Sequence, residues 1–363
     1  MMRKTGILFV FGLISLTPFA QNKKGNKIKE LVDSMTINQQ FNGVILIAEK
    51  GKTVFEKAIG YRTYADKKVL KETDVFELAS VSKQFTAMVV MQLKEKGLLQ
   101  YDDLVDKYLN IPYKGISIRN LLTHTSGLPD YQQLMDENWD KTKVAGNADI
   151  IEYLNKYHPT ALFAPGEKYL YSNTGYVLLA SIAEKVSGRD FIEYCNTEIF
   201  KKLNMQHTGI RTLAEKAAIK NFAIGHIYVN ERNEYVRADS FPSSNYTIWL
   251  GNRKGPGRVS STAADLLKWD IAIRNYTLVS KETMHEAYAP MKLNNGTFSN
   301  YGFGLQLIFK NNSLQTVWHD GDNPGYKTLI MRDLIYNRTL ILLCNTPPSE
   351  FSALINTCAK IIN

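Results

Sequence analysis

Ser80 and Lys83 are the residues of this 363-residue chain whose types and spacing point most directly to chemistry. Side chains three positions apart share a face of a helix. Lys83 is the only charged residue from Ser80 to Leu93, in a segment apolar on nearly every side, so we expect this helix to be buried. A buried lysine must reach solvent, find partners or shift its pKa. Such an amine suits a serine nucleophile, because an unassisted serine is too weak an acid to attack a carbonyl.

The pair alone leaves two interpretations open. About one or two Ser-x-x-Lys matches are expected by chance in a chain of this kind. Lys83 could simply extend from the helix end to solvent. In the catalytic interpretation, the helix N-terminus would add N–H donors that stabilise negative charge developing at Ser80.

The wider sequence context favours catalysis. The segment Phe76–Ala87 closely resembles the nucleophile segment of the serine β-lactamase and penicillin-binding-protein superfamily, in the branch of class C β-lactamases, D-Ala-D-Ala carboxypeptidases and related esterases. Further segments similar to this superfamily follow in order and together span roughly residues 42–345: Leu121–Pro129, Pro165–Tyr176, Gly257–Asp265 and His319–Gly321.

Short motifs need context, because each has competitors in this chain. Tyr-x-Asn occurs five times, but only Tyr171 follows Pro-Gly and immediately precedes an apolar helix pattern. His-x-Gly occurs twice. His207 follows a predicted helix end, whereas His319 lies between two strand patterns, where a sheet edge could line a cleft. We therefore select Tyr171 and His319.

The resemblance implies acyl transfer through a covalent acyl-enzyme. Ser80 would attack an amide, lactam or ester carbonyl, and Lys83 and Tyr171 would share the general-base work. Which of the two accepts the proton stays open. An ammonium on Lys83 is expected to lower the pKa of Tyr171, which could then protonate the leaving group. Asn173 would hydrogen-bond Lys83 or the substrate amide.

The segment His319–Gly321 resembles the third motif of the superfamily but departs from the pattern of many of its β-lactamases. Those enzymes have lysine where this chain has His319, which is mostly neutral at pH 7 unless Asp320 and Asp322 favour its protonated form. The backbone N–H groups of Ser80 and Asp322, the residue after Gly321, would form the oxyanion hole. The resemblance thus implies a D-peptidase or esterase rather than a dedicated β-lactamase. The alternative is a non-catalytic or slowly acylating penicillin-binding or sensor protein.

Composition and missing motifs exclude other classes. The formal charge of +9 does not identify a binding partner. The sequence has no basic stretch with interleaved aromatic residues that would indicate nucleic-acid binding. The six histidines show no close pair at metal-ligand spacing, and we find no phosphate-binding loop or dinucleotide fingerprint. We expect no metal and no cofactor. The expected partners are small acyl, peptide or β-lactam substrates, including cell-wall peptides.

Residues 1–20 are expected to form a signal peptide. Arg3 and Lys4 precede an apolar run, and Ala20 offers a small residue at the cut, with Gln21 as the mature start. An uncleaved anchor is the alternative, although the run is short for a full span. The protein is thus expected to be periplasmic or secreted, without stable membrane insertion, with residues 21–363 as one hydrolase domain.

The elements that position these residues predict an α+β, β-lactamase-like fold. Strand patterns near both termini suggest one antiparallel sheet flanked by helices, with a mostly helical region inserted at roughly 86–255. The expected strands are 42–50, 53–60, 305–309, 316–318, 327–332 and 338–345, and the expected helices are 80–97, 117–124, 149–158, 174–186, 190–204, one opened by a capping box at 262–265, and 349–362.

Two motif-like segments receive structural interpretations. The segment His124–Gly127 reads as a helix end and turn, and Arg253–Arg258 as a solvated basic loop rather than a contact for an anionic substrate. The loops from Ile210 to Gly251 remain unassigned. Three cysteines make a poor disulfide framework, so we expect free, buried thiols.

Overall fold

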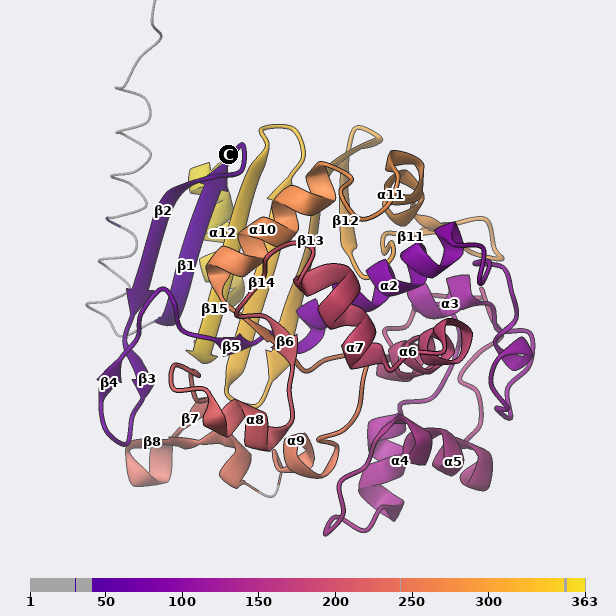
Figure 1. Ribbon diagram of the computed structural model, residues 1–363, viewed down its shortest axis with the longest axis horizontal. Coiled ribbons are helices and arrows are strands. Elements are labelled where there is room, and N and C mark those ends of the chain that lie inside the picture. Colours follow the sequence, from indigo (N-terminus) through magenta and orange to yellow (C-terminus); the bar gives the residue numbers. More distant parts are fainter. Residues whose placement is uncertain (1–29, 31–40, 242, 349–350, 363) are drawn as a thin grey trace, which may run out of the picture.

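A six-stranded antiparallel sheet forms one side of the molecule, in the order β12-β13-β14-β15-β1-β2 (Figure 1). The computed structural model describes residues 30, 41–241, 243–348 and 351–362, so the expected signal peptide lies outside the described residues. The strands of this sheet are β1 Asn42–Glu49, β2 Lys52–Ile59, β12 Gln306–Lys310, β13 Ser313–Asn323, β14 Tyr326–Asp333 and β15 Arg338–Thr346. The expected α+β fold, with a sheet from both ends of the chain, is confirmed.

The sheet lies between two hydrophobic layers, and strand β1 contributes side chains to both of them. Its side chains alternate between the faces of the sheet, as the strand period of two requires. Val44 and Leu46 belong to the main core, which includes helix α10 (Ala263–Arg274), whereas Ile45 and Ile47 pack with helix α12 (Phe351–Ile362). Figure 1 shows α10 in front of the sheet and α12 behind it.

The remaining helices lie between the two groups of sheet strands in the sequence. They are α2 Lys83–Glu95, α3 Ile118–Leu122, α4 Tyr131–Asn138, α5 Asn147–Tyr157, α6 Asn173–Ser187, α7 Phe191–Cys195, α8 Leu213–Ala218, α9 Tyr246–Trp249 and, after α10, α11 Lys281–Ala287. The helix expected over 190–204 is shorter, because α7 passes into a π-helical turn at Asn196–Phe200. Among the described helices, none has both the length and the apolar character needed to cross a bilayer.

Short strands complete the described fold. They are β3 Tyr61–Thr63, β4 Lys68–Val69, β5 Phe76–Glu77, β6 Gly209–Ile210, β7 His226–Val229, β8 Glu234–Arg237, β9 Val259–Ser261, β10 Met291–Lys292 and β11 Phe298–Ser299. The sequence patterns gave no assignment for β6 to β8. Cys195, Cys344 and Cys358 are free and buried, as expected.

Strand β13 is longer than the pattern 316–318 suggests. It continues to Asn323 because β14 pairs with it along this length, with His319 opposite Ile330 and Asp322 opposite Lys327. The third motif therefore lies within a strand rather than between two strands. Thr262 is the N-cap of helix α10, and its hydroxyl accepts from the Asp265 N–H. The second half of the expected capping box is not formed, because the Asp265 carboxylate accepts from the His207 N–H and the Thr208 hydroxyl instead.

A buried ion pair fastens α10 to the sheet. Asp270 on α10 pairs with Arg332 on β14 and accepts a hydrogen bond of 2.7 Å from the Thr339 hydroxyl on β15. Both charged side chains are almost completely buried. Removing one member of such a pair leaves an uncompensated charge in the interior.

We predict that Asp270→Ala lowers the free energy of unfolding by about 3–5 kcal/mol, measured by urea denaturation. Asp102→Ala is the control, because Asp102 is exposed where it pairs with Arg119, and its loss should cost at most about 1 kcal/mol. Arg332→Met added to Asp270→Ala should restore part of the loss. Equal, small effects for both aspartates would contradict a structural role for this pair.

Candidate active site

Ser80 lies in a tight turn between a short strand and the buried helix α2. The turn, Ala79–Ser82, is a 3₁₀ segment that follows β5, and β5 pairs with β9. Ala79 has a φ of +49°, an unfavourable value for a residue with a side chain. The backbone just before Ala79 is fixed by a hydrogen bond of 2.7 Å from the Thr328 hydroxyl on β14 to the Leu78 carbonyl oxygen. The nucleophile candidate is thereby fixed against the sheet.

Lys83 has three polar neighbours and no exposed surface. Its Nζ is 2.8 Å from Asn173 Oδ1, 2.9 Å from the Pro256 carbonyl oxygen and 3.1 Å from Ser80 Oγ. The first two oxygens can only accept hydrogen bonds, so Nζ donates an N–H group to each of them. An ammonium would donate its third N–H to Ser80 Oγ, whereas the lone pair of a neutral amine would accept from the Ser80 hydroxyl.

Burial lowers the pKa of Lys83 well below its ordinary value of 10.5, and the charge of Arg253 lowers it further. Asp130 and Asp320 oppose this shift. Burial therefore shifts the equilibrium of Lys83 toward the neutral amine, and its three hydrogen-bond contacts fit either form.

Tyr171 lies above the lysine, with its ring centre 4.8 Å from Lys83 Nζ. Burial raises its pKa well above 10, although a hydrogen bond with Ser80 opposes this effect. The expectation of a lowered tyrosine pKa is wrong, because burial of the phenol disfavours its charged form and is the largest effect on this group. Tyr171 is thus a neutral phenol, able to donate a proton.

His319 is buried rather than open to a cleft. Its Nδ1–H donates to the Asp320 carbonyl oxygen at 2.5 Å, and its Nε2 lies 2.8 Å from the Tyr301 hydroxyl, which donates to it. Burial lowers the pKa of His319 to about 3. The expectation that flanking carboxylates favour a charged histidine is therefore wrong. The Asp322 carboxylate instead pairs with Lys327.

Gly321 allows β13 to pack directly on the turn Ala79–Ser82, called the nucleophile turn below. A Cβ at this position would collide with the Leu78 carbonyl oxygen and the Thr328 hydroxyl. This close approach brings the strand that carries Asp322 beside the turn that carries Ser80. The oxyanion hole from their two backbone N–H groups stays a prediction.

His124 and Tyr301 are contacts that the sequence did not reveal. The His124 ring packs 4.2 Å from the Tyr171 ring, and its Nδ1 accepts the Ser172 N–H at 3.0 Å. The ring of Tyr301 lies 4.6 Å from that of His124 and 5.8 Å from that of His319. The turn interpretation of His124 omitted this contact, although the residue lies in a motif segment. Nothing in the spacing of Tyr301 distinguishes it.

The segment from Arg253 to Arg258 is not a solvated loop. Both arginines are buried, and Lys254 between them pairs with Glu184 and Asp190. The segment is held inward because its Pro256 carbonyl receives an N–H from Lys83.

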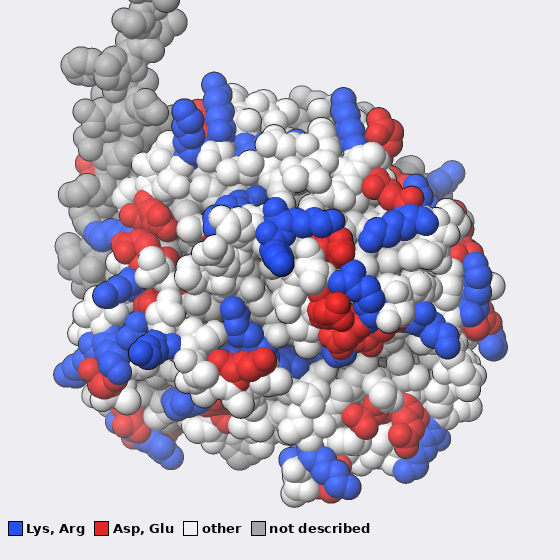
Figure 2. All heavy atoms as spheres, viewed as in Figure 1, with Lys and Arg blue, Asp and Glu red and all other residues white. Residues whose placement is uncertain are grey.

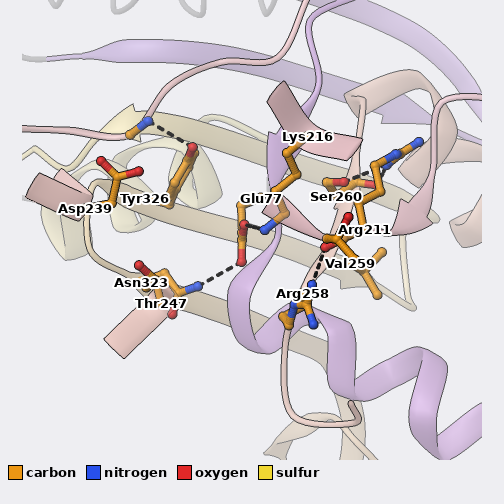
Figure 3. A network of polar contacts seen from close by, with 12 residues as sticks. Glu77, Arg211, Lys216, Asp239, Thr247, Arg258, Val259, Ser260, Asn323 and Tyr326 are labelled. Atoms are coloured by element: carbon orange, nitrogen blue, oxygen red, sulfur yellow. Dashed lines mark hydrogen bonds and ion pairs between the residues drawn. The ribbon is translucent and has the colours of Figure 1, made fainter. Parts of the chain in front are cut away.

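A cavity of about 370 Å³ is lined in part by Glu77 of β5. Its polar lining includes Glu77, Lys216 and Asn323, and Figure 3 shows Glu77 between the other two. Lys216 forms an ion pair with Glu77, whose second oxygen accepts from Asn323 Nδ2 at 3.1 Å. Leu213, Phe222 and Ile248 form part of its apolar wall.

Comparison with known proteins identifies the family of this chain. The Beta-lactamase family profile matches residues 26–358. Penicillin-binding protein 4* of Bacillus subtilis is 40% identical over 328 residues, which cover 90% of this chain and 72% of the relative. Teichoic acid D-alanine hydrolase of Staphylococcus aureus is 29% identical over 71% of this chain and 60% of its own length.

Solved structures show the same fold. A penicillin-binding protein from Bacillus halodurans superposes with a TM-score of 0.78 at 22% identity, covering 90% of this chain and 98% of the other. The D-amino acid amidase of Ochrobactrum anthropi gives a TM-score of 0.74 at 22% identity, covering 94% and 99%. The chain belongs to the β-lactamase family and is a serine hydrolase of that family.

We predict that Lys83→Arg lowers kcat/KM by about 10²- to 10⁴-fold, because a guanidinium is permanently protonated and cannot act as a base. In the unsubstituted protein, kcat/KM should already be high at neutral pH and fall only on acidification, as the lowered pKa of Lys83 requires. A pH–rate profile with a neutral ester measures both effects. Lys94→Arg, near the end of the same helix, is the control; an activity that first rises near pH 10 would refute the neutral amine.

Proposed function

We propose that this protein is an exported serine hydrolase that cleaves amide, peptide or ester bonds through an acyl-enzyme on Ser80. The observation that carries the proposal is the position of Lys83 Nζ, which lies 3.1 Å from Ser80 Oγ and also donates to the oxygens of Asn173 and Pro256. In its neutral form the amine would direct its lone pair at the Ser80 hydroxyl. This arrangement supplies the adjacent base that a serine nucleophile needs.

The proposed reaction has two steps. As the bond from Ser80 Oγ to the acyl carbon forms, the hydroxyl proton passes to Lys83 Nζ. The bond to the leaving group breaks, the leaving nitrogen or oxygen takes a proton from the Tyr171 phenol, and the Lys83 ammonium restores that proton. Water then attacks the acyl carbon, Lys83 accepts its proton, and Ser80 Oγ departs with that proton as the hydroxyl. The N–H groups of Ser80 and Asp322 would bind the oxyanion in both steps.

The third motif favours D-peptidase or esterase activity over a dedicated β-lactamase. His319 is buried and uncharged, and both of its ring nitrogens already have partners. It offers no cation for a β-lactam carboxylate. The similar teichoic acid D-alanine hydrolase acts, by its name, on D-alanine of teichoic acid, and we extend that class of D-alanyl substrate to this chain as part of the proposal.

We predict that intact-protein mass spectrometry detects a covalent adduct after brief incubation with a penicillin or an activated D-alanyl ester, and that the ester is turned over faster. Ser80→Ala should abolish both adduct and turnover, because no other group provides the nucleophile. Ser187→Ala, at the end of α6, is the control. Binding without adduct or product would instead support the penicillin-binding or sensor alternative.

Export is predicted from the sequence of residues 1–20. Full-length protein expressed in a bacterial host should be recovered outside the cytoplasm with Gln21 as its first residue, as N-terminal sequencing would show. Deleting residues 2–20 should retain it in the cytoplasm. Recovery of the intact N-terminus in the membrane fraction would favour the uncleaved anchor.

A further inference from the structure

Arg253 is a buried cation without a counter-ion among the residues that the structure describes. Only 6% of the surface of this residue is exposed. Its polar side-chain contact is a long hydrogen bond of 3.5 Å from Nη1 to the Leu250 carbonyl oxygen, and its guanidinium packs 5.7 Å from the Tyr246 ring centre. A guanidinium has five N–H donors, and a desolvated charge is costly unless it is paired. Arg253 therefore has donors available for an anion.

The neighbouring charged groups are already paired with other residues. Figure 3 shows Lys216 on Glu77 and Arg258 reaching the main chain of Arg211. Arg211 in turn donates to Ser260 Oγ at 2.6 Å. Glu77 is thus occupied by Lys216 and Asn323, so it cannot serve as the dedicated partner of Arg253. The cluster consequently has an excess of positive charge.

The guanidinium lies close to the turn that carries Ser80. Gly257 has no side chain, and the point that a Cβ would occupy there is 3.9 Å from Arg253 Nη2 and 3.8 Å from the Ala79 carbonyl oxygen. Ala79 directly precedes Ser80. Nε and Nη2 of Arg253 form no hydrogen bond with the described residues and are not completely enclosed, so they remain available to a ligand.

We propose that Arg253 is the substrate-recognition residue of this hydrolase, binding an oxyanion group of the substrate, a carboxylate or a phosphate, beside the Ser80 turn. This inference rests on the proposed acyl-transfer function. The planar guanidinium suits either anion, because its paired N–H groups match two oxygens at once. It would supply the positive charge that His319, buried and uncharged, does not.

The test uses two matched substrate pairs. N-acetyl-D-alanyl-D-alanine and its C-terminal amide differ by a carboxylate, and the D-alanyl esters of glycerol phosphate and of glycerol differ by a phosphate. For each pair, the ratio of kcat/KM for the anionic to the neutral member is measured. Arg253→Gln should lower this ratio by about 10- to 100-fold in the pair whose anion Arg253 binds. Loss of the Arg253 charge also alters the pKa of Lys83, but both members of a pair share that effect, so it cancels in the ratio. The affected pair identifies the anion.

Two further variants separate recognition from structure. Arg253→Lys keeps the charge and the aliphatic stem, so it should retain an intermediate ratio even where Arg253→Gln does not fold. Lys254→Gln removes the adjacent cation, which is paired with Glu184 and Asp190, and should leave both ratios unchanged. An equal loss on charged and neutral members, or unchanged ratios, would overturn the inference. Failure of the unsubstituted protein to turn over any of the four substrates, with Ser80→Ala as the blank, would instead refute the proposed function.

Discussion

Complete burial of one amine is the constraint on which the rest of this structure depends. Lys83 sits in the first turn of a helix that is buried on all sides, so its nitrogen must find every partner inside the protein. Those partners come from α6 and from the segment before β9, which are far apart in the sequence. The sheet, the helical layers and the inward fold of the Pro256 segment all serve to bring these oxygens to one nitrogen.

The same low-dielectric surroundings determine the protonation of the neighbouring groups. Burial disfavours charge on Tyr171 and His319 just as it does on Lys83. The polar centre therefore consists largely of neutral hydrogen-bonding groups. Permanent charge is instead carried by arginines on the side of β9, and Figure 2 shows that the charged side chains on the face in view alternate in small groups of both signs. The groups proposed for proton transfer are thus uncharged, whereas the positive charge lies on neighbouring arginines.

The sequence predicted more of the architecture than of the electrostatics. The continuous run of β-branched and aliphatic residues in Val44–Ile47 and the isolated lysine in an apolar helix are local signals, so the sheet and the buried helix could be predicted. The pairing of β13 with β14 and the inward position of Arg253 depend on contacts between distant segments, which no local pattern encodes. The pKa directions of Tyr171 and His319 were misjudged for the same reason, since burial at a site is set by the whole fold.

The position of β1 between β15 and β2 has a consequence for how the chain reaches its native state. The central partner of the first strand is synthesised last among the sheet strands, so the sheet cannot close until about residue 346 has left the ribosome. Contacts between segments so far apart in sequence slow folding, because a long loop must be ordered before they form. The nucleophile turn packs on β13 and β14, which also come late. Nascent chains should therefore stay catalytically silent, and compatible with transport in an unfolded state, until synthesis is nearly complete.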